Sequence, residues 1–412
     1  MKVNFKTMFL VLCLYLFTFQ VTLESYIPLL KYWDEIFIFL FLFSMFCQGV
    51  EKWVLGMLSL LLILILEGGV SAFINQYQPT PAVFMDAMSC IKYVCILLFA
   101  FEYFKKYDFK KHSHILSFHV KVICWMIFFM EIADSFFDIW PYSFLRWGLS
   151  ARMLCFRHPG RLAMIAMFLL LLTRFLERYS SRMKFYQYGM LLVMLSTLRA
   201  LALATVVLYF ALKLFLRKHN RINANALFLL ALLAVIGGWS QFSTYYFSGN
   251  ITCRILLTET GLRIAWDHFP FGAGLGTFAS TASGLFYSPL YFIYGLNGYY
   301  GIAPNAFNDI TDSFWGFLFG QFGLVGLVLF ILFMVTFWNR INKYYMTDTV
   351  CYQTLVLIFL YLCYATVSSI SLFHTGVVPL AFVQGICFAR LNQIAAQKQK
   401  TPLEAKGALR QL

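Results

Sequence analysis

The chain has 412 residues, of which 61% are apolar and 12% are charged, and its formal net charge is +14. So apolar a composition excludes an ordinary soluble protein and is typical of a polytopic helical membrane protein. We therefore expect an all-α polytopic membrane protein surrounded by membrane lipids. The basic excess is explained by membrane orientation and by attraction to anionic lipid, so we expect no nucleic-acid partner.

Apolar stretches close to the length that crosses a bilayer as a helix, about 20 residues, recur along the chain. About twelve such spans are predicted, at residues 7–23, 35–50, 53–72, 86–104, 115–132, 161–177, 186–198, 200–216, 226–243, 313–337, 350–370 and 376–392. The first follows basic residues as a signal peptide would. Because no small-residue cleavage site comes after it, we expect an uncleaved anchor.

Lys and Arg decide the predicted orientation, because short cytoplasmic loops are enriched in them. Most of the 32 basic residues fall in the tails and in the loops on the side of the termini, so we expect both termini to be cytoplasmic. The predicted parts are a nine-span scaffold over 1–243 with a smaller outer loop near 133–160, a large outer loop over 244–312, three last spans over 313–392 and a cytoplasmic tail over 393–412.

The smaller outer loop is rich in arginine, although the positive-inside rule disfavours arginine on that side. Its basic residues are Arg146, Arg152, Arg157 and, at the start of the next span, Arg161. One interpretation is a site for an anionic ligand. The other is interfacial anchoring beside Trp140 and Trp147, or pairing with Asp134 and Asp138.

Two further cations stand at improbable places. Arg199 follows a brief polar interruption of a long apolar run, which predicts a tight outer turn with Arg199 at the membrane boundary. Either it binds a ligand or it packs against a carboxylate. Lys92 lies inside a predicted span, where it could line a functional cavity or pair with Asp86 or Glu67.

The large outer loop is predicted to contain a short amphipathic helix along the membrane surface, ending before Pro270. Arg254 would lie near its amino end and Arg263 two to three turns later. Gly272 and Gly274 then allow tight turns close to a ligand or a helix. A dinucleotide site is not indicated, because no strand precedes these glycines.

Cysteine usage gives little sign of chemistry, since most of the ten cysteines lie in or beside apolar spans. Only Cys155 and Cys253 fall on the outer side, where a disulfide between them is a possibility in an oxidising compartment. No CxxC or HxxH spacing predicts a metal site.

Several short motifs resemble those of the O-antigen polymerase and ligase superfamily of bacterial envelope glycosyltransferases, as does the layout of spans around one late outer loop. The motifs are Phe156-Arg-His-Pro-Gly160, the turn from Ser196 to Arg199, the segment from Arg254 to Phe278 with its Asp-His-Phe-Pro-Phe-Gly-Ala-Gly-Leu-Gly-Thr-Phe, the spacing from Arg263 to Gly274, Thr311-Asp-Ser-Phe and Gly320-Gln-Phe-Gly-Leu-Val-Gly326. Ligases of this superfamily typically carry a histidine where this chain has Asp312-Ser313, which favours the polymerase (Wzy) branch.

The resemblance implies a GT-C-like fold in a bacterial inner membrane, with the large loop in the periplasm. It implies transfer of a growing glycan from undecaprenyl diphosphate onto a new undecaprenyl-diphosphate-linked repeat unit. A chain-length regulator and a flippase are further expected partners, and no cofactor or metal is expected. The alternatives are an O-antigen ligase that transfers glycan to lipid A-core, and a lipid-linked oligosaccharide flippase or other transporter.

The residues that would carry this reaction are mostly arginines, because a guanidinium can bind phosphate oxygens with two donors at once. Arg254 and Arg199 are the leading diphosphate ligands, with Arg263 third. Asp312 is the first candidate for a general base, although it could simply cap the next helix. The other base candidates are Asp309, His268 and Glu259, and the predicted substrate-binding residues are Arg263, Arg157, His268, Asp309, Gly272 and Gly274.

Overall fold

The fold is almost entirely helical, as predicted. The computed structural model describes residues 4–48, 51–218, 221–237, 239, 243 and 252–408. Residues 244–251, the beginning of the predicted large outer loop, therefore lie outside the described residues. A short antiparallel hairpin of β1 (Leu145–Arg146) and β2 (Leu149–Ser150) is the one sheet within the described ranges, and it pairs Leu145 with Ser150.

Within these ranges, a helix overlies each of the twelve predicted spans. The helices are α1 (Phe5–Leu23), α2 (Ile36–Gln48), α3 (Lys52–Asn75), α4 (Thr80–Phe104), α5 (Phe109–Phe137), α6 (Pro159–Leu176), α7 (Met183–Ser196), α8 (Ala200–Lys218), α9 (Ala224–Gly237), α14 (Phe314–Asn342), α15 (Thr349–Ala365) and α16 (Val378–Ala408). Seven are long and apolar enough to cross a membrane, namely α1, α3, α4, α5, α6, α8 and α14. The chain is thus a multi-pass membrane protein.

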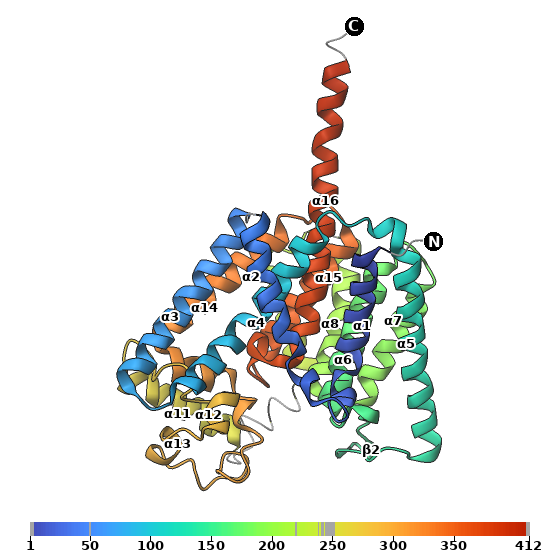
Figure 1. The fold of residues 1–412 in the computed structure, drawn as a ribbon. Helices are drawn as coiled ribbons and strands as arrows, with labels where there is room; N and C mark the ends of the chain where they lie inside the picture. Colours follow the sequence, from blue (N-terminus) through green and yellow to red (C-terminus); the bar gives the residue numbers. More distant parts are fainter. Residues whose placement is uncertain are drawn as a thin grey trace.

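Shorter elements connect the long helices. They are α11 (Cys253–Asp267), α12 (Thr281–Leu285) and α13 (Leu290–Ile293), with 3-10 turns η1 (Pro28–Glu35), η2 (Leu154–Phe156), η3 (Ile310–Asp312), η4 (Ser371–Phe373) and η5 (Thr375–Val377). Figure 1 shows the start of α1 and the far end of α16 at one end of the bundle. The elements α11, α12, α13 and β2 lie at the opposite end (Figure 1).

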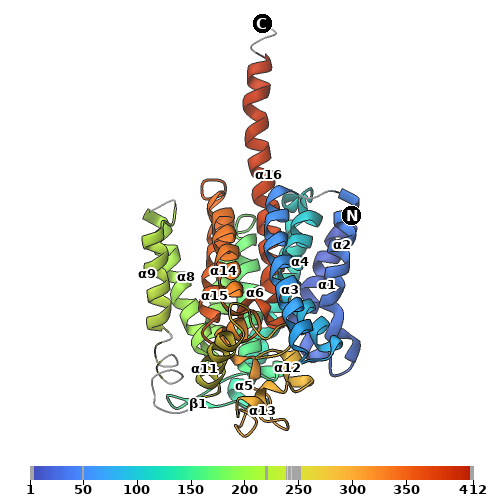
Figure 2. The same cartoon turned by 90° about the vertical axis from the view of Figure 1, so that its left-hand side faces the viewer.

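The long helices form one bundle in which α8 and α9 make one flank and α1 and α2 the other (Figure 2). Helix α6 is the most enclosed of the seven candidate spans, because 83% of its residues are buried. Helices α4 and α16 approach closely because Gly385 has no side chain. A Cβ there would lie 2.3 Å from the carbonyl oxygen of Leu97. This contact holds α4, which carries Asp86, beside the last helix of the chain.

Helix α14 is broken at Gly323, where φ is 58° and ψ is −147°. The break leaves helix backbone groups without their usual partners. The chain segment 270–276 supplies replacements: the amide of Ala273 donates to the carbonyl of Gly320 at 2.8 Å, and the amide of Leu324 donates to the carbonyl of Pro270 at 3.1 Å. The segment 270–276 is therefore built into the helix bundle.

Helix α11 occupies the place predicted for a surface helix, but one of its faces packs on α14. Leu257 and Ile264 are buried on this face. The two helices meet at Gly261 and Gly316, where a Cβ on Gly261 would lie 2.7 Å from the carbonyl oxygen of Gly316. The glycine pair thus fixes α11 against the first part of α14.

The pairing predicted for Lys92 is wrong. Its ammonium group lies 3.2 Å from Asp34 and 3.5 Å from Glu35, and not beside Asp86 or Glu67. Asp86 and Lys92 are six positions apart on α4, which places them on different faces of the helix. The turn η1 brings its two carboxylates to the face that carries Lys92.

Candidate functional site

Arg254 and Asp312 form an ion pair at the end of the bundle that carries α11. Arg254 lies in the first turn of α11, which begins after the N-cap Thr252. Its Nη2 lies 2.5 Å from Oδ2 of Asp312, and its Nε donates to the carbonyl oxygen of the same residue at 3.3 Å. The two side chains are 12% and 33% exposed, so the pair is partly buried and oriented by two contacts.

Asp312 does not cap the helix that follows it. The N-cap of α14 is Ser313, whose hydroxyl accepts the amide of Gly316 at 3.0 Å and lies 2.9 Å from the hydroxyl of Thr258. The capping alternative for Asp312 is therefore wrong. Because η3 ends at Asp312, the carboxylate turns towards α11 and is available to orient Arg254.

Arg199 lies in the predicted tight turn, between the end of α7 at Ser196 and the start of α8 at Ala200. Its Nη2 contacts Nε2 of His158. His158 is the N-cap of α6, and its Nδ1 lies 3.1 Å from the amide nitrogen of Gly160. A guanidinium only donates hydrogen bonds, so Nε2 of His158 is the acceptor in its contact with Arg199. The contact orients the Arg199 guanidinium, a donor group that suits an anion.

The electrostatics of the site also favour an anion. His158 is exposed at its edge, but partial desolvation, followed by the positive charges of Arg199 and Arg161, lowers its pKa to about 4. Burial raises the pKa of Asp312, against the opposing effects of Arg254 and Arg199. Arg199 interacts electrostatically with both His158 and Asp312, so the two clusters lie near each other.

A polar cavity of about 50 Å³ adjoins this site. Its polar lining includes Asp86, Ser89, Thr281, Thr311 and His374. Sequence reasoning gave His374 no role and treated Asp86 only as a partner for Lys92. A carboxylate at the edge of an apolar span is itself a functional signal, so Asp86 could have been found. His374 could not, because it is brought to the cavity by the η4–η5 turns.

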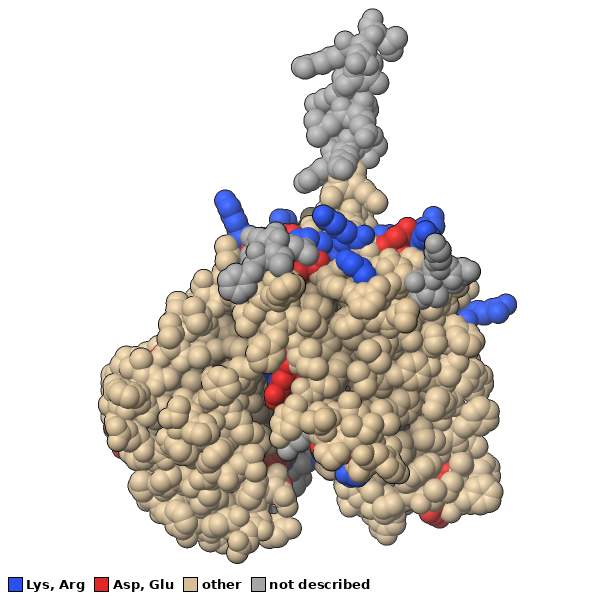
Figure 3. Space-filling view, viewed as in Figure 1, with Lys and Arg blue, Asp and Glu red and all other residues tan. Residues whose placement is uncertain are grey.

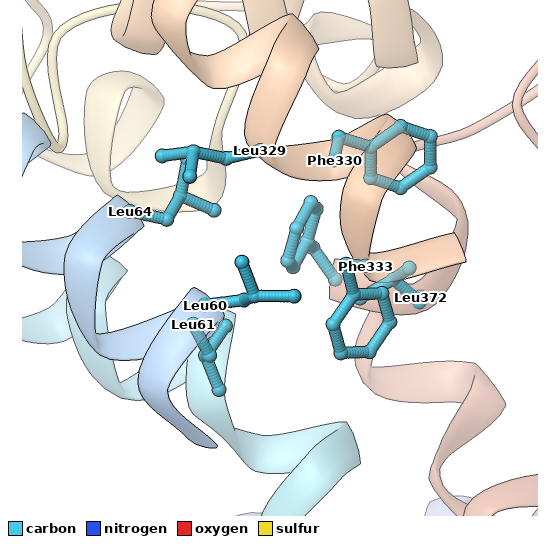
Figure 4. Close-up of a pocket in the computed structure, with 8 residues that line it drawn as sticks. Leu60, Leu61, Leu64, Leu329, Phe330, Phe333 and Leu372 are labelled. Atoms are coloured by element: carbon cyan, nitrogen blue, oxygen red, sulfur yellow. The ribbon is translucent and has the colours of Figure 1, made fainter. Parts of the chain in front are cut away.

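The second pocket is apolar and lies between α3, α14 and η4 (Figure 4). Figure 4 shows Leu60, Leu61 and Leu64 from α3 facing Leu329, Phe330 and Phe333 from α14. Phe373 lines both this pocket and the polar cavity. The ring of Phe373 therefore lies between the apolar pocket and the polar cavity.

Of the arginines in the smaller outer loop, two have structural partners. Arg152 pairs with Asp134 at 2.5 Å, which agrees with the pairing alternative. Arg146 donates to the carbonyl oxygen of Leu198 at 2.9 Å and so braces the turn that carries Arg199. Arg157 is exposed and has a positive φ of 63° beside His158.

Two predicted residues lie away from the Arg254–Asp312 pair. His268 ends α11, where its Nδ1 lies 2.9 Å from the carbonyl oxygen of Ile264. At the helical rise per residue, this places it on the order of 20 Å from Arg254. Arg263 is exposed on the same helix. Asp309, by contrast, lies near enough to Asp312 to interact with it electrostatically.

Gly272 and Gly274 approach helices closely. Close approach to a helix was one of the two predicted reasons for glycine at these positions, and close approach to a ligand was the other. A Cβ on Gly272 would lie 2.2 Å from the carbonyl carbon of Gln321 in α14. Gly274 has a φ of 103°, and a Cβ there would lie 2.2 Å from the amide nitrogen of Ala72 in α3. Their contacts with the protein account for glycine at both positions.

Cys155 and Cys253 are both free thiols. The Cys253 thiol instead donates to the carbonyl oxygen of Tyr300 at 3.0 Å. Within the described residues there is no group of three or more His, Cys, Asp or Glu side chains placed to hold a metal ion. Metal independence stays a prediction.

No family model matches the sequence, and no curated protein is significantly similar to it. The function is therefore inferred from the motifs of the sequence and from the geometry of the site.

Proposed function

We propose that the protein is a bacterial inner-membrane glycosyltransferase that polymerises O antigen or another surface polysaccharide. It transfers a growing glycan from undecaprenyl diphosphate onto the next undecaprenyl-diphosphate-linked repeat unit. The observation that carries the proposal is that Arg254 and Arg199, which are far apart in the sequence, both lie near Asp312 at one end of the bundle.

In the proposed topology all twelve long helices cross the membrane in a GT-C-like arrangement. Lys and Arg side chains gather along the end from which α16 projects (Figure 3). By the positive-inside rule that end is cytoplasmic. The arginine site then faces the periplasm, where lipid-linked repeat units are joined in the proposed reaction.

The proposed chemistry uses the arginines on the leaving group. As the bond between the anomeric carbon and the diphosphate breaks, negative charge builds on the diphosphate oxygens. The fixed donors of Arg254 and Arg199 bind these oxygens more strongly in the transition state than in the ground state, which lowers the barrier. Asp312 holds Arg254 in orientation through its two contacts and is also a candidate base.

The apolar pocket of Figure 4 suits the isoprenoid chain of the same carrier. Leucine and phenylalanine side chains line it, and an isoprenoid is excluded from water for the same reason as these side chains. When the diphosphate of the undecaprenyl carrier lies at the arginines, its isoprenoid chain lies on the membrane side of the site.

A transporter is the alternative that the broken helix α14 would favour, since broken helices line the binding sites of many transporters. Here the freed backbone groups around Gly323 are bonded to the segment 270–276. The break is therefore filled by the protein's own chain, which supports the enzyme over the transporter. The ligase remains the second enzymatic candidate.

The test replaces the arginines in a strain that lacks the chromosomal gene and reads the lipopolysaccharide ladder at equal protein level. Arg254→Ala and Arg199→Ala should each lower polymerisation by about 10²-fold or more, leaving core capped by a single repeat. Arg254→Lys should also impair it, because one point charge replaces a fork of donors. Arg182→Ala, an exposed arginine at the opposite end, is the matched control.

Other outcomes separate the alternatives. Unchanged long chains in both arginine variants would show that the diphosphate clamp is wrong. Deletion of a ligase would leave core without any glycan, and deletion of a flippase would stop units from reaching the outer face.

A further inference from the structure

The polar cavity beside the arginine site contains a buried carboxylate that the proposed mechanism has not yet used. Asp86 is 3% exposed and lines this cavity with Ser89, Thr281, Thr311 and His374. These side chains come from α4, α12, η3 and the η4–η5 turns. A volume of about 50 Å³ with several polar partners is enough to hold more than one water molecule.

The orientation of Asp86 is fixed by the glycine-rich segment. Its Oδ2 accepts the amide of Gly276 at 2.9 Å, and side-chain hydrogen bonds come from Gln321 and Ser280. Gly276 has a φ of 76°, and a Cβ there would lie 3.0 Å from the carbonyl oxygen of Ala82. The segment thus lies against α4 and holds the carboxylate at the cavity wall.

The cavity adjoins the proposed reaction site on two sides. Thr311 precedes Asp312, the partner of Arg254. His374 lies near enough to Arg161 and His158 to interact with both electrostatically. The Nδ1 of His374 accepts the amide of Gly376 at 2.9 Å, so its Nε2 carries the proton and can donate to a water or a hydroxyl.

Asp86 and Asp312 differ in their suitability as a base. The carboxylate of Asp312 lies 2.5 Å from the guanidinium of Arg254 and is engaged in orienting that side chain. The hydrogen-bond donors to Asp86 are a neutral backbone amide and neutral side chains. Cys90 and His374 also line the cavity, and Tyr291 lies near enough to Asp86 to interact with it electrostatically.

We propose that Asp86 accepts the proton of the acceptor sugar hydroxyl through water held in this cavity. The hydroxyl oxygen forms the bond to the anomeric carbon while the bond from that carbon to the diphosphate oxygen breaks. The electron pair of the broken bond leaves on the diphosphate, and the proton passes through the water to Asp86, which later returns it to solvent. This step rests on the proposed glycosyl transfer.

The test compares Asp86→Asn with the wild type in lipid nanodiscs, with purified undecaprenyl-diphosphate-linked repeat units as substrate. Asparagine keeps an oxygen that can accept the amide of Gly276 but cannot take the proton. The expected result is a kcat lowered by about 10²-fold or more with an unchanged KM for the acceptor. The control is Glu67→Gln, a partly buried carboxylate on α3 that does not line the cavity, which should keep wild-type kcat.

An unchanged kcat in Asp86→Asn, or a raised KM with normal kcat, would overturn the inference, because Asp86 would then be dispensable or would only bind the acceptor. If Asp86→Asn fails to fold, Ser89→Val decides instead, since it fills the cavity and displaces water while keeping the carboxylate of Asp86 in the chain. A lowered kcat in Ser89→Val supports the inference, and an unchanged kcat overturns it.

The wild-type protein separates this inference from the proposed function. An inactive wild-type protein would overturn the proposed function itself, whereas an active wild type beside a fully active Asp86→Asn overturns this inference alone.

Discussion

Arg254 and Arg199 reach the same site from distant parts of the chain, and each is held by a different kind of partner. Arg254 is neutralised by Asp312, whereas Arg199 contacts the imidazole of His158. Both guanidinium groups are thereby held in fixed directions by neighbouring side chains.

The lowered pKa of His158 predicts a pH-dependent stability. An unfolded histidine takes up a proton near pH 6.5, whereas the folded residue does so only near pH 4. The stabilising contribution of neutral His158 is thus complete above about pH 6.5 and is lost as the pH falls towards 4. His158→Asn keeps a helix cap, so it should lose less stability than the wild type across this window.

The measurement is the thermal unfolding midpoint in detergent between pH 4 and pH 8. Above about pH 7 the two proteins should show the same pH dependence. Identical slopes below pH 6.5 would rule out a lowered pKa at His158. Inorganic diphosphate should also reduce the difference, because an anion at Arg199 removes the charge that opposes protonation of the ring.

At the scale of elements, the break in α14 is the feature that ties the outer loop to the bundle. It exposes helix amides and carbonyls at a depth where water is scarce, and the segment 270–276 pairs with them. The same segment then passes α3, where the amide of Leu275 donates to the carbonyl of Gly68 at 2.9 Å. Two helices and one loop are thereby held as a unit that also orients Asp86.

Gly323→Ala should disrupt this unit. The backbone at residue 323 has a φ of 58°, and a Cβ there would lie 2.2 Å from the carbonyl oxygen of Phe271. The disfavoured conformation alone costs roughly 1–3 kcal/mol, and the steric overlap adds to it. We expect a lower unfolding temperature and faster amide hydrogen exchange over 270–276, measured by mass spectrometry.

Gly56→Ala in α3 is the matched control, because no atom lies within 4 Å of a Cβ at that position. It should be neutral or slightly stabilising, since alanine favours a helix over glycine. Equal stability of the two variants would mean that the break at Gly323 is not required.

At the scale of the whole molecule, the two ends of the bundle differ in charge and in the elements that they carry. Basic side chains gather at the end that holds the start of α1 and the projecting α16 (Figure 3). The surface at the other end is hollowed between the lobe with α3 and α14 and the lobe with α1 and α5 (Figure 3). For the proposed polymerase, this hollow is a candidate route by which a lipid-linked substrate reaches the arginine end.

The proposed topology predicts which positions a membrane-impermeant maleimide can reach in intact cells. Gly298→Cys is exposed near α13 with open space around its Cβ, and it should be labelled from outside. Met346→Cys is in the loop after α14, where Met346 is 69% exposed, and it should be labelled only after permeabilisation. The parent protein with its native cysteines sets the background. The reverse pattern would invert the topology and contradict a periplasmic site.

Much of this organisation could be predicted from the sequence. Apolar length located helices at all twelve predicted spans, and the Ser196–Arg199 turn and the helix after Thr252 fall where expected. Arg254 and Asp312 were both singled out before their contact was known. These features depend on local composition and spacing, so they can be read from neighbouring residues.

Contacts between distant segments could not be read in this way. The partner of Lys92, the cap Ser313 and the position of His374 were missed or wrongly assigned. Each depends on a turn whose direction is set by packing against other helices. From the sequence alone, several carboxylates are equally plausible partners for Lys92. Only the packing of the helices shows that Asp34 and Glu35 face it.

The sequence by itself determined that this chain crosses a membrane many times and that arginines lie where a membrane protein disfavours them, because hydropathy and charge act locally along the chain. Only the tertiary structure decided which of these arginines share a site, because that depends on the break at Gly323 and on the helices packed around it. The cavity at Asp86 likewise exists only where four separate segments meet.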